Sequence, residues 1–93
     1  MKNVKVLGLC AGRHELPADV QGYVFNEIID PTDTLRLADR ASFVIGQCDE
    51  LILYVTGLTV ALVEVIKHCQ WEGISLTLMH YDRETGNYFP QRV

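Results

Sequence analysis

Cationic and imidazole side chains stand at two places in this 93-residue chain where an apolar segment gives way to polar residues. Arg13 and His14 follow the apolar range 4–10, and Arg83 follows the apolar range 74–79. A guanidinium group is a planar, bidentate partner for phosphate, and an imidazole exchanges protons near neutral pH. These residue types therefore suit the binding of a phosphate-bearing ligand and acid–base chemistry on that ligand.

A third place supplies main-chain donors. The range 51–55 is bulky and apolar, Thr56 and Gly57 interrupt it, and a helical pattern begins almost at once. The turn at Gly57 and the first N–H groups of the helix, near Leu58 and Thr59, predict a small anion-binding concavity. In open α/β sheets, ligands bind beyond the carboxyl ends of the strands, which is where this turn would lie.

The elements that must position these residues form a strand–turn–helix–strand unit. The range 51–55 predicts a buried strand, 60–73 predicts a helix that ends at Gly73, and 74–79 predicts the next strand. Strands joined in this way run parallel and have a right-handed crossover, so we expect an α/β sheet.

The flanking segments extend this sheet. The ranges 4–10 and 23–29 predict two more strands. The connection 11–22 is short for a full crossover helix, which leaves the direction of the second strand open. The end of the chain, 88–93, predicts a short strand that folds back on 76–79 as an edge hairpin, and its proline favours an edge position.

A second helix is predicted from about residue 30 to residue 48. Asp30 or Thr32 is the expected N-cap, because short polar side chains satisfy the first N–H groups of a helix. Arg36 and Arg40 fall on the face opposite the apolar stripe, so we expect them in a solvated surface.

Length and composition fit one small domain, residues 1–93. The predicted fold class is α/β: a small Rossmann-like sheet of about four to five mostly parallel strands, with two main helices and a C-terminal edge hairpin. The net charge of −4 argues against binding of duplex nucleic acid, and no apolar run approaches the roughly 20 residues of a membrane span. Three cysteines without a C-x-x-C pair favour a reducing cytoplasm.

If the strands 4–10, 51–55 and 74–79 are parallel, the loops that follow them meet at one edge of the sheet. The candidate site residues at this edge are Cys10, Gly12, Arg13, His14, Thr56, Gly57, Leu58, Thr59, His80, Tyr81 and Arg83. Guanidinium groups and main-chain N–H groups suit phosphate, and Tyr81 suits stacking on a base. This combination fits a nucleotide or a cyclic oligonucleotide better than a sugar or a fatty acid.

The sequence offers two other chemistries, a cysteine nucleophile and a metal site. Cys10 near His14 suits a thiolate nucleophile, but the loop is shorter than the phosphate-cradling loop of thiol phosphatases, and a small packed residue is the favoured interpretation. His14, His80 and Asp82 lack a diagnostic metal-ligand spacing, so no metal site is predicted. No P-loop or dinucleotide fingerprint occurs, and no cofactor is predicted.

A second, weaker apolar strip runs along the helix 60–73. Its members are Val60, Val63 and Trp71. A three-layer domain this small would gain from a partner on this strip, so a homodimer is expected, and ordinary packing against a neighbouring helix is the alternative. A small subunit that docks on a larger protein is the competing functional class.

Two motifs and the chain length carry a resemblance to a known family. The motifs are His14-Glu15-Leu16-Pro17, after the first strand, and Val55-Thr56-Gly57-Leu58-Thr59-Val60-Ala61, which turns from the central strand into its helix. In these features the chain resembles the small CARF-like proteins found beside type III CRISPR systems. Those proteins are Rossmann-like domains that usually dimerise and bind cyclic oligoadenylate second messengers, and some cleave them as ring nucleases.

The resemblance implies a role in prokaryotic antiviral signalling or in its antagonism by phage. It implies a metal-independent reaction, if there is one, in which a ribose 2′-OH attacks the adjacent phosphorus. Arg13 or Arg83 would then stabilise charge on the phosphoryl oxygens, and His14 or His80 would act as general acid or base. Binding without cleavage is equally compatible with the resemblance.

Overall fold

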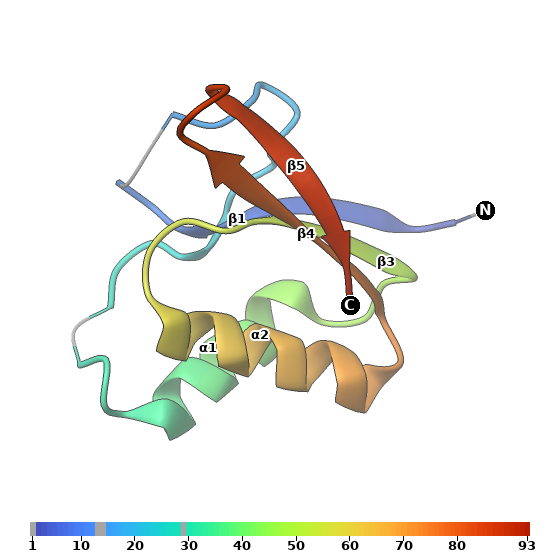
Figure 1. Ribbon diagram of the computed structural model, residues 1–93. Helices are drawn as coiled ribbons and strands as arrows, with labels where there is room; N and C mark the ends of the chain where they lie inside the picture. The colour runs from blue at the N-terminus through green and yellow to red at the C-terminus, as the bar shows by residue number, and fades with distance from the viewer. Residues whose placement is uncertain (1, 13–14, 29) are drawn as a thin grey trace.

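The computed structural model describes residues 2–12, 15–28 and 30–93. The elements in chain order are β1 (Val4–Cys10), β2 (Tyr23–Phe25), α1 (Thr34–Ile45), β3 (Glu50–Tyr54), α2 (Thr59–Glu72), β4 (Ser75–Asp82) and β5 (Asn87–Arg92). The strands form one sheet in the order β2-β1-β3-β4-β5, in which β4 and β5 are antiparallel and the other neighbours are parallel (Figure 1). The predicted α/β class, with two helices and a C-terminal hairpin, is confirmed.

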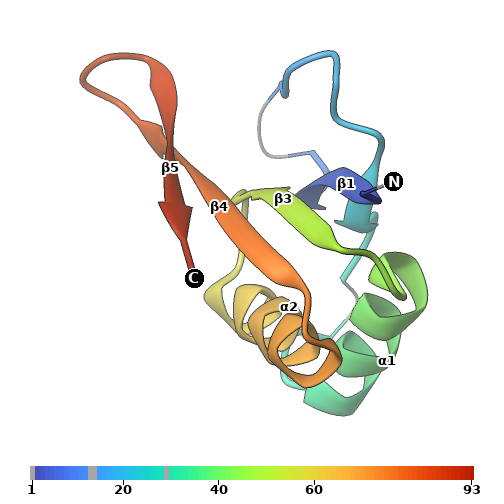
Figure 2. The same ribbon diagram turned by 90° about the vertical axis from the view of Figure 1, so that its right-hand side faces the viewer.

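The domain has two layers, because both helices cover the same face of the sheet (Figure 2). The crossovers from β2 to β3 and from β3 to β4 step in the same direction across the sheet, and right-handed crossovers therefore put α1 and α2 on one face. The step from β1 to β2 runs the other way, so a helix there would cover the opposite face. The described parts of this connection, 11–12 and 15–22, contain no helix, and the expected three-layer arrangement is wrong for this reason.

Alternate residues of the three central strands fill the space between the sheet and the helices. The core consists of Leu7 and Leu9 from β1, Leu51 and Leu53 from β3, Leu76 and Leu78 from β4, Leu37, Ala41 and Ile45 from α1, and Ala61, Val65 and Cys69 from α2. Each fully buried leucine contributes roughly 1.5–3 kcal/mol relative to an exposed one. Lys5 also faces the helices, and its ammonium group donates to Ile45 O at 2.7 Å, at the negative end of the α1 dipole.

Two predicted boundaries differ from the structure. β2 ends at Phe25, because its partner β1 ends at Cys10, which is paired with Phe25, and the chain beyond has no strand to bond. α1 is capped by Asp33, whose side chain accepts a hydrogen bond from the N–H of Arg36. Asp30 instead accepts from the N–H of Thr32 at 2.9 Å, so it shapes the preceding turn and not the helix.

α1 also ends at Ile45, three residues before the predicted end. The N–H of Gly46 donates to Ser42 O and closes the last turn. The apolar residue Cys48 extended the helical pattern in sequence, but it lies half-buried in the connection to β3. The helical spacing of buried apolar residues therefore continues past Ile45, where the helix itself ends.

β4 and β5 form the predicted hairpin, with Thr77 paired with Arg92 and Asp82 paired with Asn87. The N–H of Val93 donates to Leu76 O at 3.0 Å, and antiparallel bonding alternates along a strand. The odd-numbered positions of β5 therefore point their main-chain groups at β4, and the even-numbered positions point outward. Pro90 occupies one of these outward positions, which confirms its predicted edge location.

No helix within 2–12, 15–28 and 30–93 is both long enough and apolar enough to cross a bilayer.

Candidate functional site

The carboxyl ends of β1, β3 and β4 lie side by side, as the sequence predicted. β1 pairs in parallel with β3, and β3 pairs in parallel with β4. The strand order also reverses here, since the chain leaves β1 toward β2 on one side and then crosses to β3 on the other. Such a switch point, beyond the carboxyl ends, is the usual ligand position in open α/β sheets.

Thr56 joins two of these strand ends. Its hydroxyl donates to Cys10 O at 2.7 Å and accepts from Cys10 N–H at 3.2 Å, and its side chain is 2% exposed. The residue predicted as a ligand contact thus uses its hydroxyl to hold the β1 and β3 ends at a fixed distance. Cys10 itself is buried and belongs to the hydrophobic core, which suits a packed residue better than a nucleophile.

The turn after β3 leads directly into α2. Gly57 is exposed and has φ 101°, a conformation that L side chains rarely adopt. Leu58 is the N-cap, and no side-chain hydrogen bond caps α2. The positive end of this 14-residue helix is therefore left without the polar side chain that usually satisfies its first N–H groups, beginning near exposed Thr59.

The first loop of the predicted site is described only in part. Gly12 is exposed, with φ 79°, and a Cβ placed on it would meet no atom within 4 Å. Arg13 and His14, predicted as phosphate contact and acid–base group, lie outside the described residues.

The hairpin separates two residues that the sequence placed together in a loop. β4 continues to Asp82, so His80 and Tyr81 are consecutive strand residues and point to opposite faces. His80 Nε2 lies 2.8 Å from Gln91 Oε1, and its ring packs against Phe89 at 5.4 Å between centroids. Arg83 is exposed in the turn of the hairpin.

By the register of the paired strands, all four tyrosines of the chain lie on the face of the sheet opposite the core leucines, which the helices leave uncovered. The rings of Tyr54 and Tyr88 meet edge-on at 4.8 Å, and those of Tyr81 and Tyr88 at 5.3 Å. Tyr23 lies over Gly8, since a Cβ on Gly8 would come within 2.7 Å of its ring. Segment 15–22 and the hairpin rise on this same side of the sheet (Figure 2).

This tyrosine cluster was not predicted, although the sequence contains a signal for it. Tyr54 alternates with the buried Leu53 and is paired with Gly8 and Met79, which lie on the same face of the sheet. Counting residues from the core leucines would have placed Tyr54 opposite the helices. Burial raises the pKa of both Tyr54 and Tyr88 above the ordinary value of a phenol.

A second feature at this edge was also missed. A cavity of about 290 Å³ lies past the end of β2 and beside the first half of α1. Arg36 and Arg40 both line it, and Arg40 is half-buried, with its Nε donating to Val24 O at 3.1 Å. The expectation that Arg40 belongs to a solvated face is therefore wrong. Glu27 and Asp30 line the same cavity and balance the two guanidinium charges.

No cluster of three or more His, Cys, Asp or Glu side chains suited to a metal ion occurs among the residues that the structure describes.

The buried thiol of Cys69 and the half-buried thiol of Cys48 predict that the folded protein loses stability at alkaline pH. Burial raises the pKa of the Cys69 thiol from 9.0 to about 11, and burial also raises the pKa of Cys48. The unfolded chain therefore loses these protons at lower pH than the folded chain, so stability is fully present below about pH 9 and declines as the pH rises toward 11. In Cys69→Ala, the free energy of unfolding should fall over this pH range by up to about 2–3 kcal/mol less than in the unmodified protein.

Urea unfolding of both proteins at a series of pH values measures the effect. Cys69→Ala is expected to lower stability at every pH, because it leaves a cavity in the core. The informative quantity is the difference between the two curves, and parallel curves across the alkaline range would contradict the prediction.

A scan against protein-family models finds no matching model, and searches of curated proteins and of solved structures find no match.

Proposed function

We propose that the protein binds a cyclic oligonucleotide second messenger of the cyclic oligoadenylate kind. The observation that carries this proposal is the start of α2. The helix follows Gly57 directly, its N-cap residue Leu58 provides no side-chain hydrogen bond, and it begins at the switch point of the sheet. Main-chain N–H groups at the positive end of a helix suit a phosphate, even in a chain whose net charge is −4.

The aromatic face supports a nucleotide over other phosphate compounds. Tyr54, Tyr81 and Tyr88 lie on the uncovered face near the same strand ends, and tyrosine rings are suitable surfaces for bases. Tyr81 is 44% exposed, whereas Tyr54 is buried beneath the cluster. In this proposal phosphate contacts the loops, and bases contact the tyrosines.

Cleavage of the ligand is the finer form of the proposal. A ribose 2′-oxygen would attack the adjacent phosphorus and expel the 5′-oxygen, which leaves a 2′,3′-cyclic phosphate. One group must accept the 2′-OH proton and another must protonate the leaving oxygen. His80 already lies beside Gln91 and Phe89, so His14 is the better candidate for the first role, with Arg13 or Arg83 stabilising the phosphoryl charge.

Calorimetry against a panel of cyclic oligonucleotides tests the proposal. A charge-assisted contact is worth roughly 1.5–3 kcal/mol, so Arg13→Ala or Arg83→Ala should weaken binding by about ten- to a hundredfold. Lys2→Ala is the control, because Lys2 is exposed and precedes β1, at the opposite edge of the sheet. Binding should also weaken as salt is raised. The proposal fails if no member of the panel binds, or if all three variants behave alike.

A protein-interaction module is the second candidate function. It is favoured by the exposed fractions of Leu35, Phe43 and Trp71, which are 79%, 82% and 87%. Large exposed apolar side chains on one layer are typical of interaction surfaces. A nucleotide panel that leaves the melting temperature unchanged, together with a partner retained by the unmodified protein and lost by Trp71→Lys, would favour this function.

A further inference from the structure

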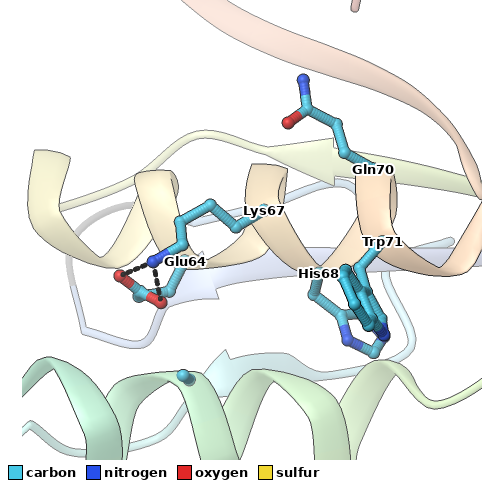
Figure 3. Close-up of a pocket in the computed structure, with 6 residues that line it drawn as sticks. Glu64, Lys67, His68, Gln70 and Trp71 are labelled. Carbon is cyan, nitrogen blue, oxygen red and sulfur yellow. Dashed lines mark hydrogen bonds and ion pairs between the residues drawn. The ribbon is translucent and has the colours of Figure 1, made fainter.

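The outer surface of the helical layer contains a groove between α1 and α2. Its volume is about 500 Å³, and it is lined by Ala38, Glu64, Lys67, His68, Gln70 and Trp71. Ala38 is the contribution of α1, and its small side chain leaves the groove open. Trp71 and His68 extend from α2 in the direction of α1 (Figure 3).

The charged residues of the groove are paired within the chain. Glu64 is only 6% exposed, and the ammonium group of Lys67 lies 3.4 Å from its carboxylate (Figure 3). His68 Nε2 lies 2.9 Å from Gly46 O, beyond the end of α1. An apolar side chain that enters the groove would therefore meet no uncompensated charge.

Large apolar side chains are exposed on the same two helices, and one of them, Trp71, lines the groove. Trp71, the single tryptophan of the chain, is 87% exposed, and Val63 of the same helix is 44% exposed. Phe43 and Leu35 are exposed on α1. An exposed tryptophan beside a groove is the arrangement found at the centre of interfaces, where tryptophan is enriched among the residues that contribute most to binding.

The charge of the helical layer is compatible with a second copy of the chain as its partner. α1 contains two arginines and one aspartate, and α2 contains one lysine and two glutamates, so the two helices together are neutral. The chain as a whole has a net charge of −4, which therefore resides outside these helices. Two copies can meet through this layer without the like-charge repulsion that other surfaces would produce.

We propose that the helical layer is the interface between two copies of this chain, and that Trp71 of each copy occupies the α1–α2 groove of the other. This rests on the homodimer expected for the proposed function and assigns the surface that forms it. A two-fold axis places the same patch on both copies, so one groove and one protruding side chain per chain suffice to close the dimer.

The helical layer is close in area to a small protein–protein interface. α2 has 14 residues, which at about 1.5 Å rise makes it roughly 21 Å long, and two packed helices present a face of about 400 Å² per copy in flat projection. Burial of both Trp71 side chains alone would remove up to about 300–500 Å². Two such faces give about 800 Å² in flat projection, which is close to the roughly 1,000 Å² in total that specific interfaces bury.

The test follows self-association of the full chain without ligand, from micromolar to millimolar concentration. Sedimentation should give a mass that rises from 10.5 kDa toward twice that value. The emission of Trp71 should shift to shorter wavelength over the same range, because the indole leaves water. Trp71→Lys removes the side chain that enters the partner's groove, and Ala38→Phe fills the groove. Each should weaken association by at least about 30-fold.

Phe89→Lys is the matched control, because Phe89 is an aromatic residue 49% exposed on β5, outside the helical layer. It should associate as the unmodified protein does. Circular dichroism of each variant establishes that it is folded, and Trp71→Lys, at an exposed position, decides the question if Ala38→Phe unfolds.

Two results would overturn the inference, and they have different consequences for the expected homodimer. In the first, the mass doubles, the Trp71 emission stays constant, and the Trp71→Lys variant associates as strongly as the Phe89→Lys variant. The dimer then forms through another face. If the mass stays at 10.5 kDa throughout, the homodimer itself fails. Nucleotide binding is measured separately by calorimetry, so neither result alone removes the proposed ligand.

Discussion

Gly57→Val is expected to abolish binding of a cyclic oligonucleotide, with an affinity loss of at least about a hundredfold. Two effects combine at this position. The φ of 101° is strained for any side chain, and a β-branched residue is the least tolerant of it. The new side chain would also stand directly before Leu58, at the start of α2, where the phosphate is proposed to bind. Calorimetric titration measures the loss.

Gly73→Val is the matched control for this substitution. Gly73 has φ 70° and lies at the opposite end of the same helix, where a Cβ would meet nothing within 4 Å. Both variants carry a comparable backbone strain, of about 1–3 kcal/mol, and most of the fold should survive in each. Only Gly57→Val should lose the ligand. Equal affinities in the two variants would remove the α2 turn from the site.

Thr56→Val is expected to produce the largest loss of stability, about 2–5 kcal/mol in the free energy of unfolding. Valine has nearly the shape of threonine, so packing is preserved. The substitution leaves both Cys10 N–H and Cys10 O without the hydroxyl that bonds them at 3.2 and 2.7 Å. Each unsatisfied buried group costs about 1–3 kcal/mol, and Thr56 is 2% exposed.

Thr56→Ser separates the hydrogen bonds from the packing. Serine keeps the hydroxyl and loses one methyl group, so the cost should stay below about 1.5 kcal/mol. Urea unfolding of the three proteins at neutral pH provides the comparison. If Thr56→Ser is as unstable as Thr56→Val, the methyl group and not the bridge between β1 and β3 holds this edge together.

The regular part of the fold could be predicted because local pattern and tertiary packing agree there. β1 has the predicted bounds, and α2 starts one residue before the predicted helix and ends just before Gly73. In both segments the apolar residues that form the pattern are those that fill the core, such as Leu9 and Val65. The pattern of these residues is sufficient because it has a single period over the whole element.

The remaining features of the fold depend on contacts between residues that are distant in sequence. β2 stops at Phe25 because β1 stops opposite it, and the segment after Phe25 alone cannot indicate this. Arg40 bonds the main chain of Val24, although its place on the helix suggests solvent. His80 was assigned to a loop because the apolar run ends at Met79, whereas pairing with β5 carries the strand on to Asp82.

The candidate site could be predicted as a location and not as a set of contacts. The adjacency of the strand ends follows from parallel crossovers, and this prediction is confirmed. Which side chains point into this location depends on the register of the paired strands and on the face of the sheet that each residue occupies. Thr56 bonds Cys10, and His80 and Tyr81 point to opposite faces, as only the paired strands reveal.

The outward position of Pro90 bears on how copies of this chain meet in a concentrated solution. A strand from another molecule would need a row of donors and acceptors along the free edge of β5, and Pro90 removes the donor at its middle. The other edge, β2, is only three residues long, and the Gln21 side chain accepts from the N–H of Val6 beyond it. Both edges of the sheet thus discourage edge-to-edge growth into fibres, which leaves the faces of the domain as the surfaces through which copies would meet.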